Sequence, residues 1–534
     1  MTFFLEDTKQ QLYWYEVIKP YIPVSKVGQD QFKQMQPFLT GDEEKWQQEM
    51  LQIELVVNLL RQKNSLIDEL DGFFSKFNDI SVLLENIIVG DYESIDPLTD
   101  GYRIKQFLWF SYMLSNKLLS EINDYDLLHF EEINWINALK LPWEDWLKLF
   151  HPTGIGTDYY PHFAMQDIDN LSLKELRRKK RSLLKQKKES ERIYQNKINE
   201  RYHITLNHLG YLVLSAQEAL LPLILRDSRF QLIREEREEY IFSLDPSDDE
   251  IKLEQEIVKI ENLIKTQEKN RFKELFEAIS FDLPLWIDAH EKWGNVEIIF
   301  KKAQMAIDYN GVKPSLERQG ENGLSIREGY HPYLNSIWQK NNQGMSPISL
   351  IIKNGVTVLY GANMSGKTIA LRTVGLLQAL AQFGFYVPAK EFHFSFVSHI
   401  SLMSGDYQDI DKGLSSFAAE VIRIKKDLSH KGQILYLADE VGKGTNPLEG
   451  EAITVSLINY LKQKKNIFCV LVTHFPNVIQ QNGVDLYETN KYKLKKVEKG
   501  NMVFEAISVA SELGLPEIIV NGAKKYLNLL SKGE

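Results

Sequence analysis

The sequence predicts a multidomain protein, in which an all-α part with a small strand-bearing insert is followed by an α/β domain. Two observations lead to this fold class. Up to about residue 320 the apolar residues recur mainly at helical spacing, and beyond it short apolar runs alternate with helical stretches. A chain of 534 residues is also too long for a single compact core, so about three to four domains are expected.

The composition is that of a globular protein from a reducing compartment. Hydrophobic residues make up 43% of the chain and charged residues 25%, which is the usual mixture. A single cysteine, Cys469, excludes an intrachain disulfide framework. The N-terminus lacks the basic and apolar regions of a secretory signal, and no apolar run reaches the roughly 18 residues of a membrane span. We therefore expect a cytoplasmic protein without a membrane segment.

Residues 1–165 are expected to form a helical core domain. Helical spacing is clear in "EEKWQQEMLQIELVVNLLRQ" and in "RIKQFLWFSYMLSNKLLSEI". Glycine is sparse, and turn signals such as "TGD" and "DPLTDG" fall between the periodic stretches. Residues 276–320 are predicted to return, as helix, to this core.

Residues 166–275 are expected to form two lever helices around a small clamp insert. One helix is predicted from "NLSLKELRRKK" to about Arg201, with Ser172 as a candidate N-cap, because the stretch lacks Pro and Gly. The second is predicted in "DEIKLEQEIVKIENLIKTQEKNRFKELFEAI". Between them, "YLVLSA" and "FQLIREEREEYIFSLDPSDD" contain β-prone residues and a turn. This order predicts a protruding antiparallel arm.

Charge is unevenly placed along the chain. The net charge is −10, yet the stretch from Lys174 to Arg192 holds ten Lys or Arg and three Glu. Such a run can neutralise DNA phosphates, or it can be the solvated face of a long helix. Helical spacing places Arg177, Lys180, Arg181 and Lys188 on one face, and these are the candidate DNA contacts.

Residues 321–534 are expected to form an α/β domain. Its short apolar runs, "VTVLY", "HISLMSG", "ILYLADE" and "IFCVLVTH", alternate with helical stretches. This alternation predicts a mostly parallel sheet with crossover helices. The chain is expected to end in a helix after Pro516.

A phosphate-binding loop follows the first of these apolar runs. Its pattern is G-x-x-x-x-G-K-[ST], between a predicted strand and a predicted helix, which is the context that the motif requires. Backbone N–H groups and the helix N-terminus would bind phosphate oxygens, Lys367 would reach the β- and γ-phosphates of ATP, and Thr368 would ligate Mg²⁺. The predicted nucleotide-binding residues are Gly361, Ala362, Asn363, Met364, Ser365, Gly366, Lys367 and Thr368.

Two acids and a histidine follow later strands of the same domain. Asp439 and Glu440 end "ILYLADE", which predicts Asp439 near Mg²⁺, through water, and Glu440 as the group that orients or deprotonates the attacking water. His474 ends the next predicted strand, where it could sense the γ-phosphate or be purely structural.

The motifs of this region resemble those of the MutS family, a branch of the ABC-type ATPases. "GANMSGKT", "GLSSFAAEV", "LADEVGKGTNPLEG" and "VTHF" occur in the order and spacing of the MutS ATPase domain. The resemblance is strong over about residues 320 to 530 and fainter upstream. It implies a homodimer in which Ser415, in trans, acts as a catalytic group at the γ-phosphate bound by the opposite subunit. It also implies that the lever helices and clamp close around a DNA duplex.

The sequence departs from a mismatch-reading MutS at both ends. Such a protein has an N-terminal domain with a G-x-F-Y-E motif, whereas only Phe4 and Glu6 of "FFLE" share that spacing here. We therefore expect no mismatch-recognition domain, and a shortened C-terminal dimerisation segment.

Two functions remain open at this point. The first is a MutS-like ATPase that drives dimer and clamp closure on duplex, mismatched or branched DNA in repair or recombination, and the basic run favours it. The second is the same ATPase acting on a protein client, such as a cobalamin-dependent amino-acid aminomutase that it reactivates. The acidic net charge favours the second function.

Overall fold

The structure is a computed structural model that describes residues 3–63, 65–122, 133, 135–150, 170–207, 210–317, 323–340, 344, 346–362, 365–404, 416–490, 493–498, 500, 507, 510–511 and 514–531. Backbone contacts divide the chain into two compact units. Unit 1 comprises Met1–Lys76, Asn116–Leu139 and Glu291–Glu534, and unit 2 comprises Phe77–Ser115 and Lys140–His290. The finer division into domains at 1–165, 166–275, 276–320 and 321–534 stays a prediction.

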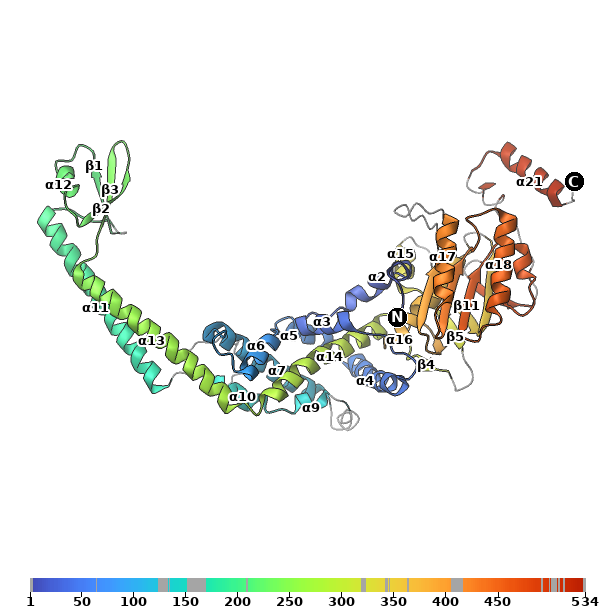
Figure 1. Ribbon diagram of the computed structural model, residues 1–534, viewed down its shortest axis with the longest axis horizontal. Helices are drawn as coiled ribbons and strands as arrows, with labels where there is room; N and C mark the ends of the chain where they lie inside the picture. The colour runs from blue at the N-terminus through green and yellow to red at the C-terminus, as the bar shows by residue number, and fades with distance from the viewer. Residues whose placement is uncertain are drawn as a thin grey trace. The chain divides into compact units, whose positions relative to one another are not determined.

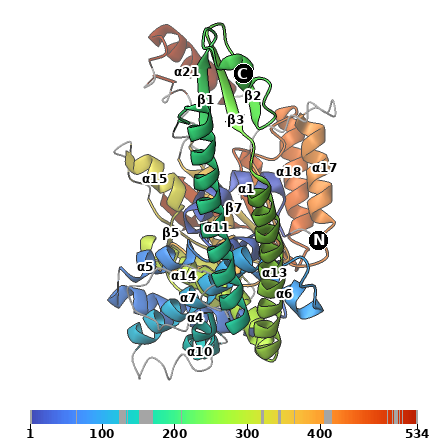
Figure 2. The ribbon, with the colours of Figure 1, turned by 90° about the vertical axis from the view of Figure 1, so that its left-hand side faces the viewer.

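Unit 2 contains two long antiparallel helices, α11 (Leu171–Tyr202) and α13 (Asp248–Ala278), which lie side by side (Figure 1, Figure 2). Both were predicted, α11 from a capped stretch without Pro or Gly and α13 from helical periodicity. Their contact is apolar, because one face of each helix supplies aliphatic side chains that lose water on packing. These side chains are Leu173, Leu183, Ile257, Ile260 and Ile264.

Both arm helices begin at a side-chain cap. Asn170 Oδ1 accepts a hydrogen bond from the Leu173 N–H at 3.0 Å, so α11 begins one residue before Ser172. The prediction of Ser172 as the N-cap is therefore wrong. At α13, Ser247 Oγ accepts from the Glu250 N–H at 3.4 Å and donates to Glu250 Oε1 at 2.9 Å.

The insert between the arm helices contains strands, as predicted, and these form a small antiparallel sheet. Its elements are β1 (Tyr211–Ser215), α12 (Leu221–Ile224), β2 (Phe230–Glu235) and β3 (Glu239–Leu244). The strand order is β1-β3-β2, and Leu212 of β1 lies opposite Phe242 of β3. These two side chains and Ile198 of α11 belong to one buried cluster, which fastens the sheet to the end of its helix.

The other helices of unit 2 surround an aromatic core. They are α6 (Ser81–Val89), α10 (Trp143–Phe150) and the parts of α7 (Pro97–Glu121) and α14 (Leu283–Asp308) that belong to the unit. The Phe107 ring centroid lies 5.7 Å from that of Trp143 and 6.4 Å from that of Trp286. Trp146 Nε1 donates to Asp282 Oδ2 at 3.0 Å, so this buried indole has its polar group satisfied.

Besides its parts of α7 and α14, unit 1 contains several helices that precede its α/β part in the chain. These are α1 (Glu6–Gln11), α2 (Trp14–Ile18), the 3₁₀ helix η1 (Lys19–Tyr21), α3 (Lys26–Gln34), α4 (Glu43–Gln62), α5 (Leu66–Phe74) and α9 (Ile136–Leu139). Trp46 Nε1 donates to the Ala381 carbonyl at 2.8 Å, and Phe38 N–H donates to the Gln382 carbonyl at 2.7 Å. The end of the helix that follows the phosphate-binding loop is thereby fixed by the N-terminal helices.

The α/β part is built on the predicted, mostly parallel sheet. Its six strands have the order β13-β12-β7-β11-β10-β9, and the pairings are parallel except between β12 and β13. Loops that follow parallel strands meet at one edge of a sheet, where ligands commonly bind. The strands are β7 (Gly355–Gly361), β9 (His399–Met403), β10 (Ile434–Asp439), β11 (Ile467–Val472), β12 (Asp485–Asn490) and β13 (Lys493–Val497).

Helices and a second sheet complete unit 1. The helices are α15 (Pro332–Lys340), α16 (Lys367–Gln382), α17 (Ser416–Leu428), α18 (Pro447–Leu461), α19 (Pro476–Ile479) and α21 (Glu517–Ser531), and α17 and α18 lie side by side (Figure 1). The second sheet has the order β4-β8-β5-β6 and was not predicted. It consists of β4 (Ser315–Leu316), β5 (Gly323–Gly329), β6 (Ile348–Lys353) and β8 (Glu391–Phe394).

Every helix among the described residues is too short or too polar to cross a lipid bilayer.

Candidate nucleotide-binding site

The phosphate-binding loop lies where the sequence predicted it, between β7 and α16. Gly361 ends β7 with a φ of +143°, and a Cβ there would lie 2.3 Å from the Thr489 carbonyl oxygen of β12. Only glycine fits both the backbone angle and this close approach. Ala362, Ser365 and Gly366 follow, whereas Asn363 and Met364 lie outside the described residues. The loop is thus attached directly to the sheet.

Lys367 is the first residue of α16, and its ammonium group points back over the loop. Its Nζ donates to the carbonyl oxygens of Gly361 at 2.8 Å and Ala362 at 2.7 Å. Burial lowers the pKa of Lys367, against the opposing effect of the Glu440 and Asp439 carboxylates. A buried ammonium group that donates to neutral carbonyls, at a helix N-terminus, is suited to an anionic ligand.

Thr368 and Asp439 meet at the end of the loop. Thr368 Oγ1 donates to Asp439 Oδ2 at 2.6 Å, and Ser404 Oγ, just beyond β9, donates to the same oxygen at 3.3 Å. Burial raises the pKa of Asp439, while the hydrogen bond from Thr368 opposes that rise. The hydroxyl and the carboxylate predicted to hold Mg²⁺ are therefore in direct contact, and Ser404 is a neighbour that the sequence did not indicate.

Glu440 occupies a special backbone position beside this pair. Its φ is +57°, which is uncommon for a residue other than glycine and is found where the surroundings impose it. Its N–H donates to the Val472 carbonyl of β11 at 3.0 Å. Glu440 Oε2 lies 3.0 Å from Lys443 Nζ, and Oε1 lies 3.8 Å from His474 Nδ1. The structure thus brings together Lys367, Thr368, Asp439, Glu440 and His474.

The polar groups of the site fit a magnesium-bound nucleotide. Ser365 Oγ is buried and has no hydrogen-bond partner among the described residues, so its hydroxyl is available to donate to a phosphate oxygen. The described residues contain no cluster of three or more His, Cys, Asp or Glu side chains that could enclose a metal ion. Mg²⁺ typically binds through one or two protein oxygens together with phosphate oxygens and water, and Thr368 and Asp439 offer such a pair.

Comparisons with known proteins agree with this site. The family described as MutS domain V matches residues 357–531, which include the loop, both acids and His474. Endonuclease MutS2 of Halothermothrix orenii is 30% identical over 253 residues, or 44% of this chain and 30% of that protein. DNA mismatch repair protein MutS of Clostridium botulinum is 29% identical over 292 residues, or 52% of this chain and 31% of that protein. Residues 357–531 thus match MutS domain V, and about half of the chain is similar to proteins of the MutS family.

The match to these MutS-family relatives is partial in length. It spans about a third of Endonuclease MutS2 from Agathobacter rectalis as well, at 29% identity over 297 residues, which are 51% of this chain and 36% of that protein. What the relatives do as whole proteins therefore enters below only as a proposal.

The second MutS-family motif is described in part. Ser415, the residue implied to act in trans, lies outside the described residues. Glu420, the acid of the pattern "SSFAAE", is buried in α17, and its Oε1 accepts a hydrogen bond from the Gly442 N–H at 2.7 Å. The sequence pattern includes this glutamate but gives it no role. The structure places it against the turn that carries Glu440.

The four candidate DNA contacts have different surroundings in the structure. Arg177 Nη2 lies 2.6 Å from Glu268 Oε1, and Lys180 Nζ lies 2.7 Å from Glu261 Oε1, so these two cations pair with carboxylates of α13. Arg181 and Lys188 are exposed. The four residues therefore do not form one solvent face, and whether any of them contacts DNA stays a prediction.

Five exposed cations of α11 form a different line. Lys174, Arg178, Arg181, Lys185 and Lys188 are exposed, and none of them forms an ion pair within the described part of the chain. Their spacing of four, three, four and three residues confines them to an arc of roughly 80° on a helix of 3.6 residues per turn. We name this set the basic stripe.

Proposed function

We propose that the chain binds ATP at Gly361–Thr368 and hydrolyses it with Mg²⁺. The observation that carries this proposal is the contact between Thr368 Oγ1 and Asp439 Oδ2 at 2.6 Å, beside Lys367 Nζ. It joins two motifs that lie about seventy residues apart in the sequence, in the arrangement that phosphoryl-transfer sites of this class require. The match to MutS domain V supports the same proposal.

Each side chain has a separate task in this proposal. Lys367 binds the β- and γ-phosphates. Its Nζ then donates to charged phosphate oxygens in place of the carbonyl oxygens of Gly361 and Ala362. Thr368 and Asp439 would hold Mg²⁺, which would supply positive charge at the phosphate oxygens. Glu440 orients the attacking water and accepts its proton at a carboxylate oxygen. His474, whose Nδ1 lies 3.8 Å from Glu440 Oε1, senses the γ-phosphate from the neighbouring strand end.

We propose further that the active unit is a homodimer with composite sites. In this proposal Ser415 donates to the γ-phosphate bound by the opposite subunit. The support is the resemblance of "GLSSFAAEV" to the second MutS motif and the match of the surrounding domain.

Mixing two inactive variants tests the composite site. Lys367→Ala removes the side-chain charge that the loop places on the phosphates, so ATP binding should weaken about 10- to 150-fold, the range for a hydrogen bond to a charged group. Ser415→Arg should bind ATP normally and be inactive. A mixed dimer keeps one intact site, so mixing should restore part of the ATP hydrolysis. Full activity of a strictly monomeric preparation would exclude the composite site.

We propose DNA as the macromolecule on which the ATPase acts, in duplex, mismatched or branched form. The printed names of the relatives, a DNA mismatch repair protein and an endonuclease, support this choice. The basic stripe supports it independently, because a line of exposed cations along a helix suits the regular spacing of phosphates. The stripe modifies the predicted contact set: Arg181 and Lys188 remain in it, whereas Arg177 and Lys180 are engaged with α13.

The alternative, a protein client such as an aminomutase, is favoured by the acidic net charge. Absence of DNA binding at about 50 mM salt, where phosphate contacts are strong, would favour it. A pull-down with the aminomutase would then be the direct test.

A further inference from the structure

Glu420 holds the turn that follows Asp439. Its Oε1 accepts a hydrogen bond from the Gly442 N–H at 2.7 Å, and its side chain is buried. Gly442 comes two residues after Glu440, within the same turn. The bond therefore joins helix α17 to the backbone that presents the Glu440 carboxylate.

The rest of the turn is fixed from other elements. The Glu440 N–H is bound to the Val472 carbonyl at 3.0 Å, and Thr454 Oγ1 donates to the Val441 carbonyl at 2.9 Å. A Cβ on Gly442 would lie 2.7 Å from the Gly450 carbonyl oxygen, so the backbone of α18 contacts the turn directly. With φ of Glu440 at +57°, the turn keeps its shape only while such contacts impose it.

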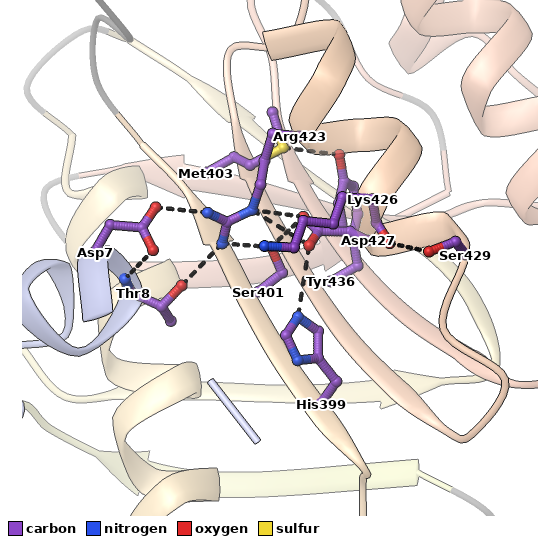
Figure 3. Close-up of polar contacts among 10 residues, drawn as sticks. All are labelled: Asp7, Thr8, His399, Ser401, Met403, Arg423, Lys426, Asp427, Ser429 and Tyr436. Atoms are coloured by element: carbon purple, nitrogen blue, oxygen red, sulfur yellow. Dashed lines mark hydrogen bonds and ion pairs between the residues drawn. The ribbon is translucent and has the colours of Figure 1, made fainter. Parts of the chain in front are cut away.

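Helix α17 is itself anchored one turn further along, at Arg423 (Figure 3). Arg423 Nη1 donates to Asp7 Oδ2 of α1 at 2.6 Å, and Nη2 donates to Thr8 Oγ1 at 3.0 Å. Its Nε lies 3.0 Å from Asp427 Oδ2 on the same helix. The Arg423 side chain is only 10% exposed, and its partner Asp427 on the same helix is buried, so this charge-assisted pair is largely shielded from water.

The same cluster reaches the sheet. Arg423 Nη2 donates to Ser401 Oγ of β9 at 3.2 Å, and Ser401 Oγ donates to Asp427 Oδ2 (Figure 3). His399, also on β9, has Nε2 3.5 Å from Asp427 Oδ1. Strand β9 leads to Ser404, which contacts Asp439. One arginine thus ties α17 to α1 and to β9, within three residues of Glu420.

We infer that Glu420 is a positioning residue for Glu440, and that the cluster of Arg423, Asp7, Thr8, Ser401 and Asp427 holds Glu420 in place. Through this cluster, the seating of α1 sets how firmly the turn at 439–445 is held. The kinetic consequence of this inference, a slower hydrolysis when Glu440 is misplaced, rests on the proposed function. Its structural part, the hold of Glu420 on the Gly442 N–H, is independent of that activity.

Hydrogen exchange of the full-length protein tests the structural part. In Glu420→Ala the Gly442 N–H loses its acceptor, so a peptide covering residues 439–445 should exchange about tenfold or more faster. Glu420→Gln should keep near-normal protection, because the amide oxygen still accepts the bond. Equal protection in Glu420→Ala and wild type would overturn the inference whether or not the protein hydrolyses ATP.

Steady-state kinetics test the consequence for Glu440. Glu420→Ala should lower kcat about 10- to 100-fold, as expected for a misplaced reacting group, with KM for ATP within about twofold of wild type. Glu420→Gln should recover most of kcat. A loss confined to KM, or equal inactivity of both variants, would contradict a positioning role.

The Arg423 cluster is tested by milder changes and by non-additivity. Asp7→Asn and Thr8→Val leave the Arg423–Asp427 pair intact, and each should speed exchange at residues 439–445 and lower kcat. The double variant Glu420→Ala with Arg423→Ala should have the same kcat as Glu420→Ala. Both changes act through one hydrogen bond, that of the Gly442 N–H to Glu420, which the first change already removes. The matched control is Lys425→Ala, an exposed position on α17, which should behave as wild type. Additive losses, or an effect of Lys425→Ala equal to that of Asp7→Asn, would overturn the role of the cluster.

If wild-type protein hydrolyses no ATP, the proposed function fails. The exchange experiment still decides whether Glu420 and the Arg423 cluster hold the turn.

Discussion

The nucleotide site and helix α11 both depend on charged residues, but their charges are positioned in opposite ways. At the nucleotide site Lys367 is buried and bound to backbone carbonyls, and Glu440 is fixed by an unusual backbone angle. On α11 the cations lie on a helix surface, and each one either pairs with α13 or faces solvent. Position is set by the backbone in the first region and by helix packing in the second.

This difference explains why single substitutions should matter so unequally. The role of a buried group with a fixed geometry cannot be taken over by its neighbours, so its loss removes a whole step of the proposed ATP hydrolysis. A cation in an exposed row neutralises one of several similar phosphates, and its loss removes a fraction of the affinity. The following predictions test that contrast.

The largest effect is expected for Glu440→Gln. The amide cannot accept the proton of the attacking water, so the ATP hydrolysis rate should fall roughly 10²- to 10⁴-fold while ATP binding is retained. Turnover and binding should be measured on the same preparation. Glu449→Gln, an exposed carboxylate early in α18, is the matched control and should hydrolyse ATP normally. Normal turnover in Glu440→Gln would contradict the assignment of Glu440 as the base that accepts this proton.

A smaller, graded effect is expected for the basic stripe. The test variant changes Arg178, Arg181 and Lys188 together to Gln. For duplex DNA, it should flatten the slope of log affinity against log salt by up to about 2.7, because each phosphate that is no longer neutralised contributes about 0.9. The control variant changes three other cations of α11 to Gln, namely Arg177, Lys180 and Lys187. These cations pair with Glu268, Glu261 and Glu254 of α13. It should flatten the slope by less than about 1. ATP hydrolysis without DNA should be unchanged in both variants.

Equal slopes for the two triples would show that the exposed stripe is not the DNA-contacting face. Circular dichroism should confirm that both variants retain their helical content.

The smallest effect is expected for the interhelical ion pairs. A double-mutant cycle with Arg177→Ala and Glu268→Ala should give a coupling free energy of unfolding of up to about 1 kcal/mol, as for other partly exposed pairs. The side chains are 21% and 19% exposed, which limits the screening by water. The control cycle of Arg178 with Glu268 should give about zero. Urea denaturation, followed by helix content, measures the coupling free energy in both cycles. A coupling of several kcal/mol would mean that the ion pairs, and not the apolar contact between α11 and α13, stabilise the arm.

The elements with strong periodicity were predictable from the sequence. The arm helices, the strand-bearing insert and the parallel strands β7, β9, β10 and β11 occur where the sequence placed them, whereas β12 and β13 were not predicted. The sheet β4-β8-β5-β6 was missed, because strands as short as Ser315–Leu316 and Glu391–Phe394 are defined by their partners and carry little local signal. The cap of α11 was misplaced because Asn170 and Ser172 are both common N-cap residues.

The same reasoning applies to the candidate sites. Lys367, Thr368, Asp439 and Glu440 lie together because a strand, a loop and a helix N-terminus fix them locally, and their motif encodes that geometry. The DNA face was harder to predict, since the ten cations between Lys174 and Arg192 do not reveal which side of the helix packs on α13. The contact of Glu420 with Gly442 joins distant segments and could not be derived from spacing alone.

The contact between Thr368 and Asp439 is best tested by single-turnover hydrolysis with protein in excess over ATP. Wild-type protein should convert bound ATP to ADP in the presence of Mg²⁺ and should stop when the metal is chelated. Thr368→Val removes the hydroxyl that contacts Asp439 Oδ2 at 2.6 Å, so it should bind ATP but hydrolyse it far more slowly at any Mg²⁺ concentration. Conversion at the same rate in Thr368→Val, or in wild type without Mg²⁺, would contradict the proposed site.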